Sequence, residues 1–267
     1  MEYLRGWRAM RQDPQWTNKV LIASVLALSA MCIPVFGQLV LTGWAALMLR
    51  RAVSGQDSPL PRMDFDFDYF MKLLNVGFKG FLARLVWSIP MIMIGVTMGC
   101  CMYAAMAGSM VAAAGGAAAG GEAGGALGGL AGLCFFGAVM IIMPVVMILI
   151  GMPMQIAVLR AELTDDVNAA MKFKEVLDTT KMLFKELLVG SFVLGLVGLA
   201  AGIASVFTLY LLLPSAMVVM TIIHAYFHAE LYRVYLEKGG QPLPLGPLEV
   251  EGGDPPQVGN PPAQPGW

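Results

Sequence analysis

Lysine and arginine are absent from three long stretches of this sequence, residues 20–49, 85–159 and 186–232, although the chain contains 17 of them. Charged residues make up only 13% of the 267 residues, about half of their share in ordinary water-soluble domains, whereas hydrophobic residues make up 58%. The hydrocarbon core of a bilayer excludes cations, which gather in cytoplasmic loops. This distribution argues against a water-soluble domain and predicts an integral membrane protein that crosses the bilayer several times.

The sequence also lacks the motifs of a signal peptide, of a cysteine-based site and of the common catalytic sites. The first 16 residues are polar and basic, so we expect no cleavable signal peptide and expect the first apolar stretch to direct insertion. The four cysteines lack a CxxC spacing, and we interpret them as small hydrophobic residues within the membrane. The sequence shows no Gly-rich phosphate loop after a strand, no Ser-His-Asp candidate and no paired carboxylates within an apolar stretch. We therefore expect no enzymatic activity, no catalytic residue and no cofactor.

The second and third apolar stretches are long enough for two spans each, since a helix needs about 20 apolar residues to cross a bilayer. In the second stretch the spans lie near 85–110 and 131–159, with a Gly/Ala-rich run at 112–130 between them. Repeated Gly-Gly pairs disfavour a helix, so we expect this run to be an external loop. Its GxxxG-like spacings leave a helix-packing face as the alternative. The third stretch turns near 202–207, so the sequence predicts an all-α fold with four full transmembrane helices.

The first apolar stretch, 20–49, exceeds one span and falls short of two. A single crossing would place Arg50 and Arg51 opposite the basic N-terminal segment, against the tendency of cations to remain inside. Pro34 and Gly37 favour a break at its centre. We predict a re-entrant helical hairpin shielded from lipid by other helices, with a long, kinked single span as the alternative.

Two further segments, 68–82 and 171–188, have an apolar face opposite a face with lysines. This pattern is typical of amphipathic helices that lie in the membrane surface with their lysines toward lipid phosphates. Basic residues spread along the membrane plane suit anionic lipid and not nucleic acid. We expect contacts with anionic headgroups from Lys72, Lys79, Lys174, Lys181 and Lys185.

An internal repeat is predicted because each amphipathic segment leads into two spans and then a similar ending, AVLRAEL at 157–163 and AYFHAEL at 225–231. The predicted organisation is a cytoplasmic segment at 1–19, a helical membrane domain at 20–236 and a Pro/Gly-rich cytoplasmic tail at 237–267. Such a tail cannot bury a core, so we expect it to be disordered.

Three short motifs together resemble the prokaryotic membrane family called domain of unknown function 4013, over roughly residues 14–236. The first is an entry into the first apolar stretch, formed by Pro14, Trp16 and Lys19. The second is an aromatic exit from that stretch, Gly43 and Trp44, which runs to Arg50 and Arg51. The third is a turn with Gly55, Leu60 and Pro61 before an acidic helix start at Asp64. The resemblance implies an integral membrane protein of several helices. It brings no known catalytic residue to this chain.

Three residues form one candidate metal site. His224 and His228 are one helical turn apart, which places both imidazoles on one helix face, as metal binding requires. Glu162, the repeat counterpart of Glu230, would be the third ligand and would also make an intramembrane enzyme conceivable. The alternative, which we favour, is a polar pair that contacts carbonyls or headgroups at the cytoplasmic end of a helix.

Methionines at every fourth position form a second candidate site. Met98, Met102 and Met106 share a helix face, and thioethers are ligands that select Cu(I). Methionine is also common packing material in apolar segments, and this interpretation is the one we favour. We therefore assign no metal site from the sequence.

Together these observations predict a non-enzymatic membrane-organising, lipid-interacting or partner-scaffolding component of the prokaryotic cytoplasmic membrane, with both termini cytoplasmic. Its expected partners are the lipid bilayer, anionic lipids at the cytoplasmic face, and a protein partner or a second copy of the chain. The alternative is a passive channel or transporter for a small solute or a soft metal such as Cu(I).

Overall fold

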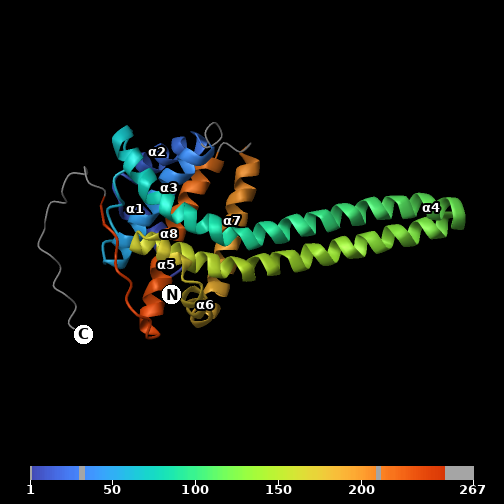
Figure 1. Ribbon diagram of the computed structural model, residues 1–267. Coiled ribbons are helices and arrows are strands. Elements are labelled where there is room, and N and C mark those ends of the chain that lie inside the picture. Colours follow the sequence, from blue (N-terminus) through green and yellow to red (C-terminus); the bar gives the residue numbers. More distant parts are fainter. Residues whose placement is uncertain (1, 30–33, 209–211, 250–267) are drawn as a thin grey trace, which may run out of the picture.

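The computed structural model describes residues 2–29, 34–208 and 212–249, and between residues 101 and 144 it describes the side chains of only a few positions. The secondary structure of this part is α-helical, which confirms the predicted fold class (Figure 1). The helices are α1 (Arg5–Gln12), α2 (Trp16–Ser29), α3 (Pro34–Val53), α4 (Phe67–Thr164), α5 (Val167–Met171), α6 (Phe173–Met182), α7 (Phe184–Phe207) and α8 (Leu213–Glu237).

Helix α8 lies at the centre of the helical body, where it contacts α1, α2, α3 and α7. Its side chains are buried almost continuously from Ala225 to Tyr232. Since α3 also packs against both α4 and α8, these three helices form the framework on which the other helices are placed.

The two ends of α4 lie side by side, so this element forms two antiparallel arms that extend together from the body (Figure 1). We call residues 67–104 the outgoing arm and residues 145–164 the returning arm. A Cβ atom at Gly95 of the outgoing arm would lie 3.9 Å from Cε of Met147 on the returning arm. The prediction of a loop at 112–130 is wrong for the backbone, because these residues lie within α4 and are helical, as in the alternative of a helix.

Among the residues that the structure describes, three helices are long and apolar enough to cross a membrane. They are Phe67–Ala104, Val145–Thr164 and Phe184–Phe207, with mean hydropathies of 1.9, 1.6 and 2.3. These spans support a membrane protein. The fourth predicted span, α8, is not one of them, and its polar residues, including His224 and His228, lower its mean hydropathy.

The first apolar stretch forms two separate helices, α2 and α3, and not a single kinked one. Lys19 near the start of α2 donates a hydrogen bond to the carbonyl of Leu60 (2.7 Å), and Arg51 near the end of α3 donates to the carbonyl of Pro59 (3.4 Å). Both ends therefore reach the same loop, as in a helical hairpin. Pro34 begins α3, a position where its missing N–H leaves no helical bond unmade.

The predicted surface helix at 68–82 is wrong, because this segment is the base of the outgoing arm and packs against α3. Leu73 is fully buried, and a Cβ atom at Gly77 would lie 1.9 Å from the carbonyl oxygen of Leu39. The periodicity of apolar residues is the same whether a helix packs on a neighbouring helix or on a membrane, so the sequence could not separate the two cases.

The second amphipathic segment, 171–188, is divided among α5, α6 and the start of α7. Helix α6 buries Val176 against the body and leaves Phe173 and Leu177 exposed. An amphipathic helix with part of its apolar surface free thus lies at this position, as predicted.

The tail prediction is wrong for residues 240–249, which contact the helical body. The Leu243 amide donates to the Tyr232 hydroxyl, and the Gly246 amide donates to the Leu163 carbonyl (both 2.8 Å). Backbone hydrogen bonds and the burial of Leu243 against the core hold a segment whose composition suggested disorder. Residues 250–267 lie outside the described part of the chain.

Candidate functional site

A cavity of about 560 Å³ lies between α3, α7, α8 and the bases of both arms of α4. One end is polar, and the other end is lined by small or apolar side chains of α7 and the start of α8. The polar end includes Thr42, Arg84, Gln155, Glu162, His224 and His228. The apolar end includes Gly198, Ala201, Gly202, Leu213, Ala216 and Met217.

The structure brings together the three residues of the first candidate metal site. Oε2 of Glu162 on the returning arm lies 3.8 Å from Nδ1 of His228 on α8, and both residues are buried. The rings of His224 and His228 are 6.2 Å apart, edge to face. Within the described ranges, however, no group of three or more His, Cys, Asp or Glu residues is placed to hold a metal ion. The three residues form a buried polar cluster and not a ligand set.

Two side chains in the cavity wall carry a buried atom that lacks a hydrogen-bond partner in the described structure. These atoms are Nε2 of His228 and Oε1 of Gln155. The amide nitrogen of Gln155 donates to Ser191 Oγ on α7 (3.2 Å), so only one end of this amide is used. A buried polar group without a partner loses the hydrogen bond that water would have provided.

The threonine hydroxyl groups that line the cavity donate hydrogen bonds to backbone carbonyls of their own helices. Thr42 donates to the Gln38 carbonyl (2.8 Å), and Thr221 donates to the Met217 carbonyl (2.9 Å), in each case one turn back along the same helix. These hydroxyls therefore offer only acceptor oxygens to the cavity. Apart from the Arg84 guanidinium, which can only donate, the polar end thus offers acceptor oxygens from Thr42, Gln155 and Glu162.

Arg84 and Gln155 were not predicted as members of this site. Arg84 begins no motif and only borders an apolar stretch, while Gln155 is an isolated polar residue inside a predicted span. A polar side chain within a span is rare and marks an interior or functional position, and this signal could have identified Gln155.

The second candidate metal site, the methionine stripe, lies on the outgoing arm. Met98 and Met102 are partly exposed, and Met106 is exposed. The next methionines along the chain in α4 include positions 140 and 143, whose side chains lie outside the described part. Copper binding by this stripe stays the alternative to the packing role that the sequence favours.

The predicted headgroup lysines differ in their surroundings. Lys79 forms an ion pair with Asp165, at the end of the returning arm, so a protein carboxylate competes with lipid for its ammonium group. Lys72, the other predicted lysine of the outgoing arm, is exposed. The three lysines on α6 and at the start of α7, Lys174, Lys181 and Lys185, are exposed as well.

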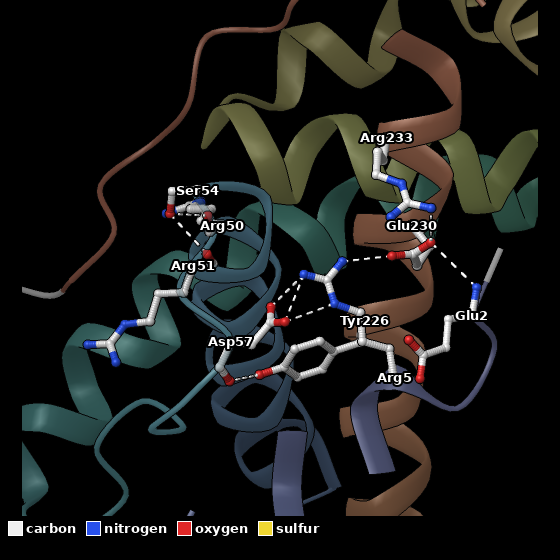
Figure 2. Close-up of polar contacts among 9 residues, drawn as sticks. All are labelled: Glu2, Arg5, Arg50, Arg51, Ser54, Asp57, Tyr226, Glu230 and Arg233. Carbon is white, nitrogen blue, oxygen red and sulfur yellow. Dashed lines mark hydrogen bonds and ion pairs between the residues drawn. The ribbon is translucent and has the colours of Figure 1, made fainter. Parts of the chain in front are cut away.

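The ending of the second predicted repeat contributes a structural ion-pair cluster (Figure 2). The carboxylate of Glu230 is almost fully buried and accepts a bond from Arg5 (2.7 Å), which also contacts Asp57 (2.7 Å). The Tyr226 hydroxyl donates to the Asp57 carbonyl. This cluster joins α1 and the loop before α4 to α8.

A second buried carboxylate holds the entry motif in place. Asp13 accepts bonds from Lys19 Nζ (2.8 Å) and from the amides of Gln15 (2.8 Å) and Leu60 (2.9 Å). Burial raises the pKa of Asp13, but these bonds outweigh it and keep the pKa below its usual value. The lysine of the entry motif thus has a structural role.

Comparison with known proteins adds a family and no activity. A family model described as "Protein of unknown function (DUF4013)" matches residues 26–213. No curated protein and no solved structure matches the chain.

Proposed function

Since the chain belongs to the DUF4013 family of proteins of unknown function, we propose a role that rests on its own structure. The protein is a non-enzymatic component of the prokaryotic cytoplasmic membrane that binds anionic lipids at the cytoplasmic face and provides a scaffold for a protein partner or a second copy. The single observation that carries this proposal is the surface of α6.

Helix α6 and the first residue of α7 expose an apolar surface beside basic residues. The exposed fractions are 53% for Phe173, 43% for Leu177 and 45% for Phe184. The basic residues next to them are Lys174, Lys181 and Lys185. Aromatic and aliphatic side chains that enter the headgroup region, with lysines beside them, are the pattern of a helix that binds an anionic membrane surface.

The spans supply the membrane setting for this surface. Large apolar side chains are exposed on the outgoing arm and on α7, including Met93 (66%), Phe192 (63%) and Leu199 (61%). In the proposed topology α8 is the fourth span, the α2–α3 hairpin is re-entrant, and both termini are cytoplasmic. The meeting of both hairpin ends at one loop supports this topology, because it leaves Arg50 and Arg51 on the side of the basic N-terminal segment.

Replacing Lys174, Lys181 and Lys185 together with glutamine is expected to reduce the preference of the protein for anionic over zwitterionic lipid. Each lysine near an anionic surface contributes about 1 kcal/mol, so we expect a loss of about fivefold per lysine. Native mass spectrometry of protein purified from mixed nanodiscs would count the retained lipids. The matched control changes the same three lysines to arginine, which keeps the charge. Equal retention by the glutamine and arginine variants would contradict the proposal.

A second candidate function is a passive path for a small solute or a soft metal such as Cu(I). Met98 and Met102 share the outgoing arm with Gly95, where Met147 of the returning arm approaches closely. This proximity of the two arms would allow thioethers to face each other.

Changing Met98, Met102 and Met106 to leucine tests this candidate, because leucine keeps the apolar volume and removes the sulfur. If the stripe conducts copper, this variant loses both copper uptake and the copper retained by purified protein. The control is the triple leucine variant of Met71, Met93 and Met182, which are exposed elsewhere. Unchanged copper content and uptake in the stripe variant would rule out the copper version.

A further inference from the structure

We propose that the cavity between α3, α7, α8 and the two arms of α4 binds a neutral amphiphile that has a hydroxyl head and a single aliphatic chain. The ligand would enter from the bilayer, so the inference rests on the proposed membrane setting. It assigns a ligand class to a cavity, whereas the function proposed above concerns the outer surface of α6.

The shape of the cavity fits an elongated amphiphile. Along α8 the lining runs from Leu213 at the apolar end to His228 at the polar end, which at 1.5 Å per residue is about 22 Å. The volume of about 560 Å³ lies within the range of about 300–1,000 Å³ that is usual for small-molecule sites.

Small residues of α7 create the space for the chain. A Cβ atom at Gly202 would meet no atom within 4 Å, and one at Gly198 would meet only Cε of Met220, at 3.7 Å. With larger side chains at these positions α7 would fill the apolar end. An aliphatic chain that enters there from the bilayer would stay in apolar surroundings and would displace no protein atom.

The balance of donors and acceptors selects a head that donates a hydrogen bond. Gln155 and His228 each keep one unpartnered polar atom, and the protons of Thr42 and Thr221 are used within their own helices. A hydroxyl both donates and accepts hydrogen bonds, so it can bond to the unpartnered atoms of Gln155 and His228. A carboxylate can only accept, so it could bond to the Arg84 guanidinium but would leave the acceptor oxygens of Gln155, Thr42 and Thr221 without a donor.

The charges of the wall favour a head without net charge. Arg84 and Glu162 line the same cavity with opposite formal charges, and within the described residues Arg84 has no hydrogen bond or ion pair with protein. An anionic head would lie near Glu162, and a cationic head near Arg84. Each arrangement adds a like-charge contact in a poorly hydrated site.

The test measures thermal unfolding of the full chain in nanodiscs of zwitterionic lipid with dodecan-1-ol, dodecane or dodecanoate added. At tenfold its Kd, dodecan-1-ol is expected to raise the Tm by about 3 to 6 °C, and the other two probes by clearly less. An equal shift with dodecane would overturn the hydroxyl head. A larger shift with dodecanoate would overturn the neutral head.

Two variants connect the shift to this cavity. Gly202→Leu fills the apolar end and is expected to abolish the shift. Ala204→Leu should keep it, because Ala204 lines only the adjoining apolar groove beside α1 and not the cavity. Gln155→Leu is expected to weaken dodecan-1-ol binding by about 2-fold to 10-fold, the worth of one neutral hydrogen bond. A shift that survives Gly202→Leu would overturn the proposal.

The same experiment separates this inference from the proposed function of α6. The variant of Lys174, Lys181 and Lys185 should bind dodecan-1-ol as the unmodified protein does, because these lysines do not line the cavity. Loss of anionic-lipid preference with normal dodecan-1-ol binding would support both proposals. Loss of dodecan-1-ol binding in the lysine variant would overturn the cavity proposal alone.

Discussion

Gly77→Ala is expected to lower the free energy of unfolding by about 3 kcal/mol, at the upper end of the usual cost of overpacking. The added Cβ atom would lie 1.9 Å from the carbonyl oxygen of Leu39 and 2.6 Å from the amide nitrogen of Gly43. Both atoms belong to the backbone of α3, so no side chain can rotate away. The outgoing arm would have to move off α3, which holds the arm to the body.

The measurement is unfolding of the purified protein in mixed micelles, followed by circular dichroism. Gly99→Ala is the matched control, since Gly99 is an exposed glycine of the same arm whose Cβ atom would meet nothing within 4 Å. Alanine has the higher helix propensity, so the control should be unchanged or more stable by up to about 1 kcal/mol. If the two alanine variants were equally stable, the close contact of α3 with the outgoing arm would be refuted.

Arg50→Met is expected to cost about 3–5 kcal/mol, the usual result of removing one partner from a buried ion pair. The Arg50 side chain is completely buried. It bonds to the Asp165 carboxylate (2.8 Å), the Glu162 carbonyl (2.6 Å) and the Pro247 carbonyl (3.0 Å). Without it, these acceptors lose a charged donor, and the segment at 240–249 loses one of its attachments.

Two measurements test the role of Arg50. Unfolding in mixed micelles reports the stability, and limited proteolysis reports release of residues 240–249, which should be cleaved faster in the variant. Arg8→Met is the control, because Arg8 pairs with Glu2 at an exposed position and such pairs contribute less than about 1 kcal/mol. A variant at Arg50 as stable and as protease-resistant as the control would show that the buried contacts contribute nothing.

Local patterns were sufficient for the helical fold and for the apolar segments. The absence of cations between Arg84 and Arg160 led to two spans, and the structure places an apolar helix at each end of that stretch. The break before Pro34 and the family resemblance were also predicted, and the family match over 26–213 confirms the latter. Hydropathy and helix breakers act over one or two turns, so they can be recognised without knowledge of any neighbour.

The candidate site was predicted only in part. His224, His228 and Glu162 were selected from spacing and from the repeated ending, and they do share one cavity. Arg84 and Gln155 were missed, because each becomes a site residue only when the two arms of α4 fold against α3 and α8. The placement of 68–82 was wrong for the same reason.

The sequence by itself therefore determined the class of the protein, its helical segments and its family, since these depend on the composition of continuous segments. Only the tertiary structure decided that Lys79 pairs with Asp165, that Gly77 meets the backbone of α3, and that the cavity has one polar and one apolar end. These properties depend on distances between segments far apart in the chain. Residue periodicity defines which face of a helix is apolar, but it does not identify the partner that covers that face.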